Sequence, residues 1–241
     1  GGPARALPGA AYRRRGGVSG AAPDARTDGA DPGADRAALR AAARALSTTG
    51  NVGTSGNLSV RRDAGMLITP SGVPYEALRA EDLVAVDLDG AASGRLAPSS
   101  EWRFHRAIYA ARPEAGAIVH SHSPHATALA CLGRPIPAFH YEVAFAGGRD
   151  IRCATYATYG TEALSDRVIE ALAGRRACLV ANHGMVCFGA DLERALSLAQ
   201  IVEQLARIYL LALSAGEPRV LSDEEMERVV AKFEDYGPGS P

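Results

Sequence analysis

Hydrophobic and polar positions alternate along this chain in two ways, one typical of helices and one typical of strands. Helix formers fill residues 35–50, and an apolar stripe at helical spacing runs through 191–214. Leu58 and Val60 alternate with polar residues, and a turn at Asp63–Gly65 precedes a second apolar run, which predicts a hairpin. The pattern predicts helices over 35–50, 98–113, 123–131, 161–173, 191–214 and 222–237, a hairpin within 57–72, and strands over 82–90, 116–122, 149–157, 177–182 and 185–189.

Strands and helices interleave in this pattern, and hairpins join several of the strands. Short hairpin connections force antiparallel pairing, whereas strands joined through a helix can also run parallel. We therefore expect an α/β fold with three layers, α/β/α, in which helices cover both faces of a mixed and largely antiparallel sheet.

The first 34 residues have a different composition from the rest of the chain. They are rich in Gly, Ala, Pro and Arg, include "RRR" at 13–15, and contain almost no large aliphatic residue. Such a segment cannot bury enough apolar surface to offset the entropy of ordering it. We expect a disordered extension over 1–34, without the apolar region of an export signal, and a single domain with a helical C-terminal tail over 35–241.

Charge and cysteine content narrow the possible partners and compartments. The formal net charge is −1, which gives no electrostatic reason to expect nucleic acid or an anionic membrane as a partner. No apolar run approaches the roughly 18–20 residues that span a bilayer. The four cysteines form no CxxC pair, so we interpret them as unpaired thiols of a cytoplasmic protein.

Three of the six histidines fall within "HSHSPH", residues 120–125. Residues two apart in a strand point the same way, so His120 and His122 leave the end of the strand over 116–122 together. This predicts either a pair of metal ligands or a polar end of a strand. His125 follows Pro124 in the first turn of a helix, where the helix dipole disfavours a charged imidazole, and we expect it to cap or pack locally.

Two further residues could complete a metal site. His183 lies in "ANHGMV", where we expect a tight turn that uses the conformational freedom of Gly184. Catalytic zinc takes three protein ligands and keeps a position open, which His120, His122 and His183 would supply. Glu101 is the candidate carboxylate; alternatively it is a first-turn acid that the helix dipole favours, with Ser99 or Ser100 as the N-cap.

His105 and His140 carry weaker signals. His105 lies four residues after Glu101 on the same helix face, so the two could share a metal or form an ordinary surface contact. His140 lies in a loop beside Tyr141.

Three short segments combine glycine with hydroxyl side chains. They are "TTGNVGTSGN" at 48–57, "TPSG" at 69–72 and "PSS" at 98–100. Glycine-rich turns can point backbone N–H groups at an anion, and the third segment begins a helix, which also favours anions. Each segment alone could be only a turn, whereas all three around one site would form a phosphate cradle of neutral donors.

Five blocks of the sequence, in this order, resemble the class II sugar-phosphate aldolases of the L-fuculose-1-phosphate aldolase type, whose wider family includes the ribulose-5-phosphate 4-epimerases. The blocks are "TSGNLSVR", "LITPSGVPYEAL", "SSEWRFHRAIYAARPEAGAIVHSHSPHATALAC", "IPAFHYEVAFAGG" and "ANHGMV". The likeness runs from about residue 34 to "LSDEEMERVVAKFEDYG" near the end of the chain.

The resemblance implies roles for individual residues. It makes His120, His122 and His183 zinc ligands, with Glu101 as the fourth ligand at rest and the acid/base once substrate displaces it. It places the substrate phosphate at three loops, with residues Ser55, Gly56, Asn57, Ser71, Gly72, Ser99 and Ser100. It makes Tyr141 a proton donor that reaches a neighbouring subunit, and Tyr236 a tail residue near the active site, in a homotetramer with sites between subunits. Tyr159 stands where the fuculose enzyme has phenylalanine on the aldehyde side.

The implied reaction is reversible cleavage of a ketose 1-phosphate, such as L-fuculose 1-phosphate or a 5-deoxypentulose 1-phosphate, to dihydroxyacetone phosphate and an aldehyde. Zinc on three neutral histidines keeps a positive charge, which suits it to stabilise the anion formed when C3–C4 breaks. The only lysine, Lys232, lies in the helical tail, which argues against a Schiff-base aldolase. The alternatives are a 4-epimerase, a methylthioribulose-1-phosphate dehydratase and a non-catalytic adducin-like binding domain.

Overall fold

The structure is a computed structural model, and it describes residues 32–47, 54–63 and 65–234. The predictions for residues 1–31, Gly50 and Tyr236 lie outside these ranges. The first helix, α1 (Pro32–Ser47), begins three residues before its predicted start. Proline is well tolerated in the first turn of a helix, because the N–H that it lacks would have no partner within the helix there.

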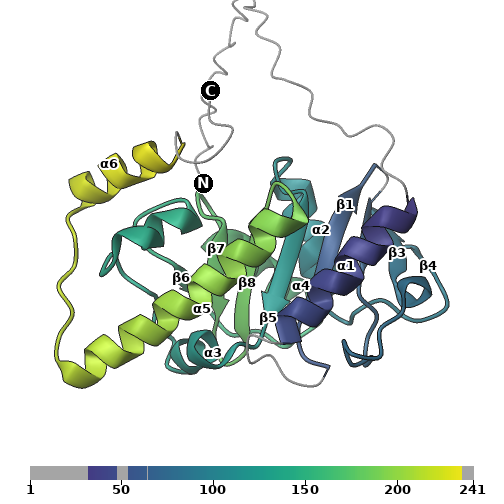
Figure 1. Cartoon of the computed structure of the whole chain (residues 1–241), viewed down its shortest axis with the longest axis horizontal. Coiled ribbons are helices and arrows are strands. Elements are labelled where there is room, and N and C mark those ends of the chain that lie inside the picture. Colours follow the sequence, from purple (N-terminus) through teal and green to yellow (C-terminus); the bar gives the residue numbers. More distant parts are fainter. Residues whose placement is uncertain (1–31, 48–53, 64, 235–241) are drawn as a thin grey trace, which may run out of the picture. The chain divides into compact units, whose positions relative to one another are not determined.

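Within the described residues, eight strands form one mixed sheet (Figure 1). Their order is β4-β3-β2-β1-β5-β8-β7-β6, and all neighbours are antiparallel except β6 and β7. The strands are β1 (Asn57–Arg62), β2 (Gly65–Ile68), β3 (Val84–Asp87), β4 (Ala92–Ser93), β5 (Ala117–Ser121), β6 (Arg152–Ala154), β7 (Ala177–Val180) and β8 (Gly184–Gly189). The predicted mixed, largely antiparallel sheet is confirmed, and only the two-residue β4 was not foreseen.

Helices cover both faces of this sheet (Figure 1). The remaining helices are α2 (Trp102–Ala111), α3 (Pro124–Cys131), α4 (Glu162–Ala171), α5 (Leu192–Ala215), α6 (Asp223–Glu234) and the 3₁₀ helices η1 (Ala80–Asp82) and η2 (Tyr141–Ala146). The core on one face holds side chains of α1, α3 and α5, and the core on the other holds side chains of α2 and α4. The chain therefore has the three predicted layers.

The strand alternation sends the central side chains to one core or the other. In β5, Val119 joins the core under α5, while Ile118 joins the core under α2. His120 is two residues beyond Ile118, so it points toward the α2 side, as the period of two requires. The layer under α2 therefore holds the first candidate ligand.

The long helix α5 has both the length and the composition of a membrane span, with a mean hydropathy of 1.4 over its most apolar window. Its apolar stripe is nevertheless used inside the fold. Buried side chains such as Leu198, Val202 and Leu205 lie along one side of it and belong to the core over the sheet. This stripe matches the helical spacing seen in the sequence.

Candidate metal centre

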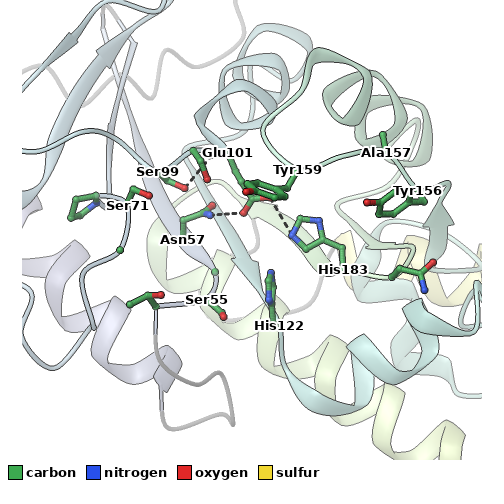
Figure 2. A pocket seen from close by; sticks show the side chains of 16 residues that line it. Ser55, Asn57, Ser71, Ser99, Glu101, His122, Tyr156, Ala157, Tyr159 and His183 are labelled. Carbon is green, nitrogen blue, oxygen red and sulfur yellow. Dashed lines mark hydrogen bonds and ion pairs between the residues drawn. The ribbon is translucent and has the colours of Figure 1, made fainter.

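Four side chains converge at one end of β5. His120 belongs to β5, His122 follows it, His183 lies in the turn between β7 and β8, and Glu101 is the N-cap of α2. One ligand atom from each lies within 4.8 Å of the others. Nε2 of His120 is 3.1 Å from Oε2 of Glu101, and Nε2 of His183 is 3.2 Å from Oε1. These four residues are called the ligand cluster below, and Figure 2 shows His183 directed at the Glu101 carboxylate.

The close pairing of β5 with β8 brings His183 to the other ligands. Ser121 lies opposite Met185 in this pairing. A Cβ added to Gly184, the residue just before Met185, would lie 2.4 Å from the Ser121 carbonyl oxygen. The prediction that Gly184 supplies an unusual backbone conformation is wrong, because the left-handed residue of this turn is Asn182, with φ 54°. Glycine is needed at 184 because the two strands approach too closely there for any side chain.

The donor set fits a metal ion. Nδ1 of His120 lies 2.9 Å from the carbonyl oxygen of Met185, so Nδ1 carries the proton and the Nε2 lone pair faces the cluster. Oε1 of Glu101 is buried and has no hydrogen-bond partner. Three imidazole nitrogens and one carboxylate are ligands that zinc accepts in tetrahedral sites, and a cation would satisfy Oε1, which among the described residues has only the His183 ring beside it.

The charges of the cluster oppose the effect of burial. Burial disfavours the Glu101 carboxylate, but His120 and then His183 outweigh it and hold the pKa of that carboxyl far below its usual range. Burial lowers the pKa of His122 to about 4, and the charges of His120 and His183 add to that effect. An ionised carboxylate beside a neutral imidazole is the state in which both groups bind a metal.

Glu101 is held from the other side by polar contacts of its own. Nδ2 of Asn57 donates to Oε2 at 3.0 Å, and the Glu101 N–H donates to Oγ of Ser99 at 3.3 Å (Figure 2). The prediction of Ser99 or Ser100 as the helix N-cap is wrong, because Glu101 itself occupies that position, just before the first turn. Its carboxylate is directed at the histidines and makes no capping bond.

The three glycine and hydroxyl segments meet beside the ligand cluster. A pocket of about 310 Å³ is lined by Glu101, His122 and His183 and by all seven residues predicted for the phosphate. Those seven are Ser55, Gly56, Asn57, Ser71, Gly72, Ser99 and Ser100. Ser71 N–H donates to Ala97 and Ser99 N–H donates to Thr69, which ties the second segment to the third. The pocket wall therefore carries hydroxyl groups and backbone N–H groups in place of lysine or arginine.

Sequence reasoning did not find every residue of this pocket. Tyr156, Ala157 and Asn182 also line it, and Tyr159 lies beside them (Figure 2). Tyr156 and Tyr159 are both largely exposed, in the coil that follows β6. Two tyrosines three apart in a coil after a strand were the available signal, because exposed aromatic residues often mark binding surfaces.

Tyr141, one of the two tyrosines predicted to act on the substrate, is not part of this wall. Tyr141 begins η2, is 49% exposed, and stacks on Phe233 of α6 with ring centroids 6.1 Å apart. It is not among the residues that line the pocket. Tyr236 lies outside the described residues, so both assignments stay predictions.

The remaining histidines have other partners. The prediction for His105 is wrong in both of its forms, since the side chain is completely buried, neither on the surface nor in the ligand cluster. Nδ1 of His125 lies 2.6 Å from the carboxylate of Glu203, which also accepts the N–H groups of His125 and Ala126. The prediction that His125 caps or packs locally is wrong, because its partner Glu203 lies on α5, but His125 stays outside the ligand cluster as expected. His140 is the N-cap of η2.

Comparisons with known proteins agree with this geometry. The family profile described as class II aldolase and adducin N-terminal domain matches residues 37–210. The 5-methylthioribulose-1-phosphate/5-deoxyribulose-1-phosphate aldolase of Rhodospirillum rubrum is 55% identical over 78% of this chain and 85% of its own length. The L-fuculose phosphate aldolase of Escherichia coli K12 is 51% identical over 78% of this chain and 87% of its own length.

A solved structure named L-fuculose 1-phosphate aldolase superposes with a TM-score of 0.80 and 43% identity, covering 83% of this chain and 95% of its own. Fold, sequence and the ligand cluster thus agree with the resemblance seen in the motifs. The chain belongs to the class II aldolase and adducin N-terminal domain family, and within it to the aldolases.

Proposed function

We propose that this enzyme reversibly cleaves a ketose 1-phosphate to dihydroxyacetone phosphate and an aldehyde, with zinc as its metal. The observation that carries the proposal is the meeting of the ligand cluster and three phosphate-type loops in one pocket. A ketose 1-phosphate carries its phosphate close to the carbonyl carbon. One pocket of this size therefore has room for the phosphate at the loops and for the carbonyl group at the ligand cluster.

Zinc is proposed because three imidazoles and a carboxylate are typical zinc ligands, although cobalt and manganese accept them too. His120, His122, His183 and, at rest, Glu101 would hold the ion. A bound metal ion supplies Lewis-acid stabilisation of negative charge on substrate oxygens. The hydrogen bond from His120 Nδ1 to Met185 fixes the ring that presents Nε2 to it.

Glu101 is proposed as the acid/base. In the condensation direction its carboxylate would remove a proton from dihydroxyacetone phosphate, and in the cleavage direction it would return that proton. Its position beside the histidines supports this role, because the metal and the reacting carbons would meet at that point of the pocket. Tyr141 of a neighbouring subunit would protonate the aldehyde oxygen, with Tyr236 close to the same site.

The substrate phosphate would be bound by neutral donors. Ser55, Ser71, Ser99 and Ser100 offer hydroxyl groups, and Gly56, Asn57 and Gly72 offer backbone N–H groups. Binding of the phosphate would orient the ketose over Glu101, so that the bond that breaks is aligned with the catalytic groups.

The proposed substrates are a 5-deoxypentulose 1-phosphate and L-fuculose 1-phosphate. Two relatives that share about half of their residues with this chain support them, since their names contain 5-deoxyribulose 1-phosphate, which is a 5-deoxypentulose 1-phosphate, and L-fuculose phosphate. The exposed pair Tyr156 and Tyr159 would line the aldehyde side of the pocket.

A homotetramer with sites between subunits is the proposed assembly, since Tyr141 needs a neighbouring subunit to act as assigned. The cytoplasm is the proposed compartment. All four cysteines lie within the described residues and are free thiols, which suits a reducing environment.

A coupled assay for dihydroxyacetone phosphate over a panel of ketose 1-phosphates, with and without chelator, tests this function. We expect release from at least one 5-deoxy sugar, loss of release with chelator, and recovery with zinc. An epimerase or a dehydratase would consume its substrate without releasing dihydroxyacetone phosphate, and that outcome would contradict the proposal.

The variant Glu101→Gln tests the assigned base. It should retain the metal, because three histidines remain, and lose about 10²–10⁴-fold in turnover, because the amide cannot accept the proton. Turnover equal to that of the natural enzyme would remove Glu101 from the acid/base role.

A further inference from the structure

From Glu101 into the protein interior, four more side chains form a continuous row of hydrogen bonds. Nδ2 of Asn57 donates to the Glu101 carboxylate at 3.0 Å, and Oδ1 of Asn57 lies 2.5 Å from Nε2 of His105. Nδ1 of His105 lies 2.7 Å from Oγ of Ser59, which lies 2.8 Å from the Tyr109 hydroxyl. All four are buried. Asn57, His105, Ser59 and Tyr109 are called the buried polar row below.

The row is built from one strand and one helix with matching repeats. Glu101, His105 and Tyr109 are spaced i, i+4, i+8 at the start of and along α2, and Asn57 and Ser59 are spaced i, i+2 on β1. Four helical residues rise about 6 Å and two strand residues about 6.6 Å, so side chains of the two elements can alternate in contact. The order along the row is helix, strand, helix, strand, helix.

The chemistry of the groups sets the direction of every bond in the row. An ionised carboxylate only accepts, so Asn57 must turn its NH₂ group to Glu101 and its carbonyl oxygen to His105. His105 must then carry its proton on Nε2, and a neutral Nδ1 accepts from Ser59. The Ser59 oxygen is left to accept the Tyr109 hydroxyl, so each donor atom of the row has an acceptor.

Burial supports the neutral form of His105. Its pKa is lowered to about 3, chiefly by burial and further by the charge of His120. A charged His105 would have a proton on both nitrogens, so Ser59 would have to donate to Tyr109, and the Tyr109 hydroxyl hydrogen would then have no acceptor in the row.

Loss of the His105 N–H would free the Asn57 amide to rotate. In the rotated form Asn57 would present its oxygen to the Glu101 carboxylate, which repels it, and the carboxylate would lose this buried partner. Asn57 also lines the pocket, so the row reaches from the interior to the substrate side.

We propose that His105 is a positioning residue for the aldol reaction, which through the Asn57 amide holds the carboxylate of Glu101 in the orientation needed to exchange a proton with substrate. His105 does not line the pocket and does not belong to the ligand cluster. The inference rests on the proposed role of Glu101 and deepens it.

A matched pair of amide substitutions tests the role. The amide nitrogen of His105→Gln can reach the place of Nε2 and donate to Asn57, whereas the shorter side chain of His105→Asn reaches only the place of Nδ1, toward Ser59. Residues that orient metal ligands typically contribute 10–100-fold in activity. We expect His105→Asn to lose about that much in kcat, with KM and metal content close to those of the natural enzyme, and His105→Gln to recover at least tenfold of the loss.

Equal kcat values for the two variants would overturn the proposal, and so would a loss seen only in KM. Metal content by elemental analysis and thermal unfolding are measured on both, because a purely structural role would lower stability in both variants without separating their kcat values.

The tautomer gives a readout that does not depend on turnover. Nitrogen-15 NMR of labelled histidine side chains near pH 7, with His105→Gln used to assign the signal, should show His105 neutral and protonated on Nε2. A proton on Nδ1 or on both nitrogens would overturn the row direction. If no ketose phosphate yields dihydroxyacetone phosphate, the proposed function is wrong. The NMR measurement would still test the tautomer of His105, because it does not depend on turnover.

Discussion

The ligand cluster and the buried polar row meet at Glu101, but the cluster opens to the pocket, whereas His105, Ser59 and Tyr109 of the row lie inside the protein, away from the pocket wall. His120 and His105 show the contrast, since both are completely buried. Burial opposes a charge on His120, yet contact with Glu101 raises its pKa, whereas burial lowers the pKa of His105 to about 3. Burial acts against a charge on both rings, and it is outweighed only at His120, where the Glu101 carboxylate lies 3.1 Å from Nε2.

The two regions also differ in how their polar atoms are satisfied. In the row, every donor has an acceptor among the four residues and Glu101. In the cluster, Oε1 of Glu101 is buried without a hydrogen bond, and the three Nε2 atoms converge with it on one point. A row that is complete in itself maintains geometry, while an incomplete cluster has room for a cation.

The largest difference between the two regions should appear when a cluster histidine is removed. We expect His183→Ala and His122→Ala to lose bound metal and at least about 10³-fold of dihydroxyacetone phosphate release, because two histidines and a carboxylate bind the ion less tightly. Elemental analysis of the purified variants and the coupled assay measure both effects.

His125→Ala is the matched control for these variants. It removes a histidine of the same segment whose ring pairs with Glu203 and lies outside the cluster. It should keep its metal. If the cluster variants bind as much metal as His125→Ala, the ligand assignment is wrong.

A smaller effect of another kind is expected within the row. Ser59→Ala leaves the Tyr109 hydroxyl and Nδ1 of His105 without their partner inside the core. An unpaired buried polar group costs about 1–3 kcal/mol, so the free energy of unfolding should fall by that amount while metal content is kept. Urea unfolding measures the change.

Ser214→Ala serves as the control for Ser59→Ala. The Ser214 hydroxyl is exposed and bonds to the carbonyl of Leu211 in α5, so its removal should change stability by no more than about 0.5 kcal/mol. Loss of metal in Ser59→Ala at unchanged stability would mean that the row and the cluster are not separate in function.

The last effect is a pH dependence of stability. The pKa of His105 is about 3 in the folded protein and ordinary in the unfolded chain, so the unfolded state binds the additional proton as pH falls below about 6.5. His105 therefore contributes a loss of stability from pH 6.5 toward pH 3, approaching about 1.4 kcal/mol per pH unit. Stability at higher pH is unaffected by this group.

Urea unfolding of metal-free protein between pH 7 and pH 5 measures this slope. His105→Gln, which does not titrate, should show a shallower slope than the natural protein. Parallel slopes would mean that His105 is already charged in the fold, which would contradict the tautomer assigned to the row.

Several features of the fold and site were available in the residue pattern. The period of two put His120 on the face of Ile118, and the structure has it there. The "ANHGMV" turn and the Glu101 segment were identified as ligand sources, and both reach the cluster. These predictions succeeded because each depends on spacing within one element or on a turn beside a strand end.

His105 shows where local spacing was insufficient. Its place four residues after Glu101 predicted either a surface contact or a ligand, and it is neither. Its partners Asn57 and Ser59 lie on β1, more than 40 residues earlier in the chain. The packing of α2 against β1 decides its role, and no pattern within α2 reports that packing.

The sequence by itself determined the residue types: three neutral nitrogen ligands, one carboxylate, and three segments rich in glycine and hydroxyl groups. It also determined the alternation that builds the sheet and its covering helices. The tertiary structure alone decided that the ligand cluster and the three loops share one pocket. It also decided that the close approach of β8 to β5 requires glycine at 184, and that the buried polar row contacts Glu101. The reason is physical, because spacing along the chain fixes which way a side chain points, whereas distances between segments depend on how sheet and helices pack.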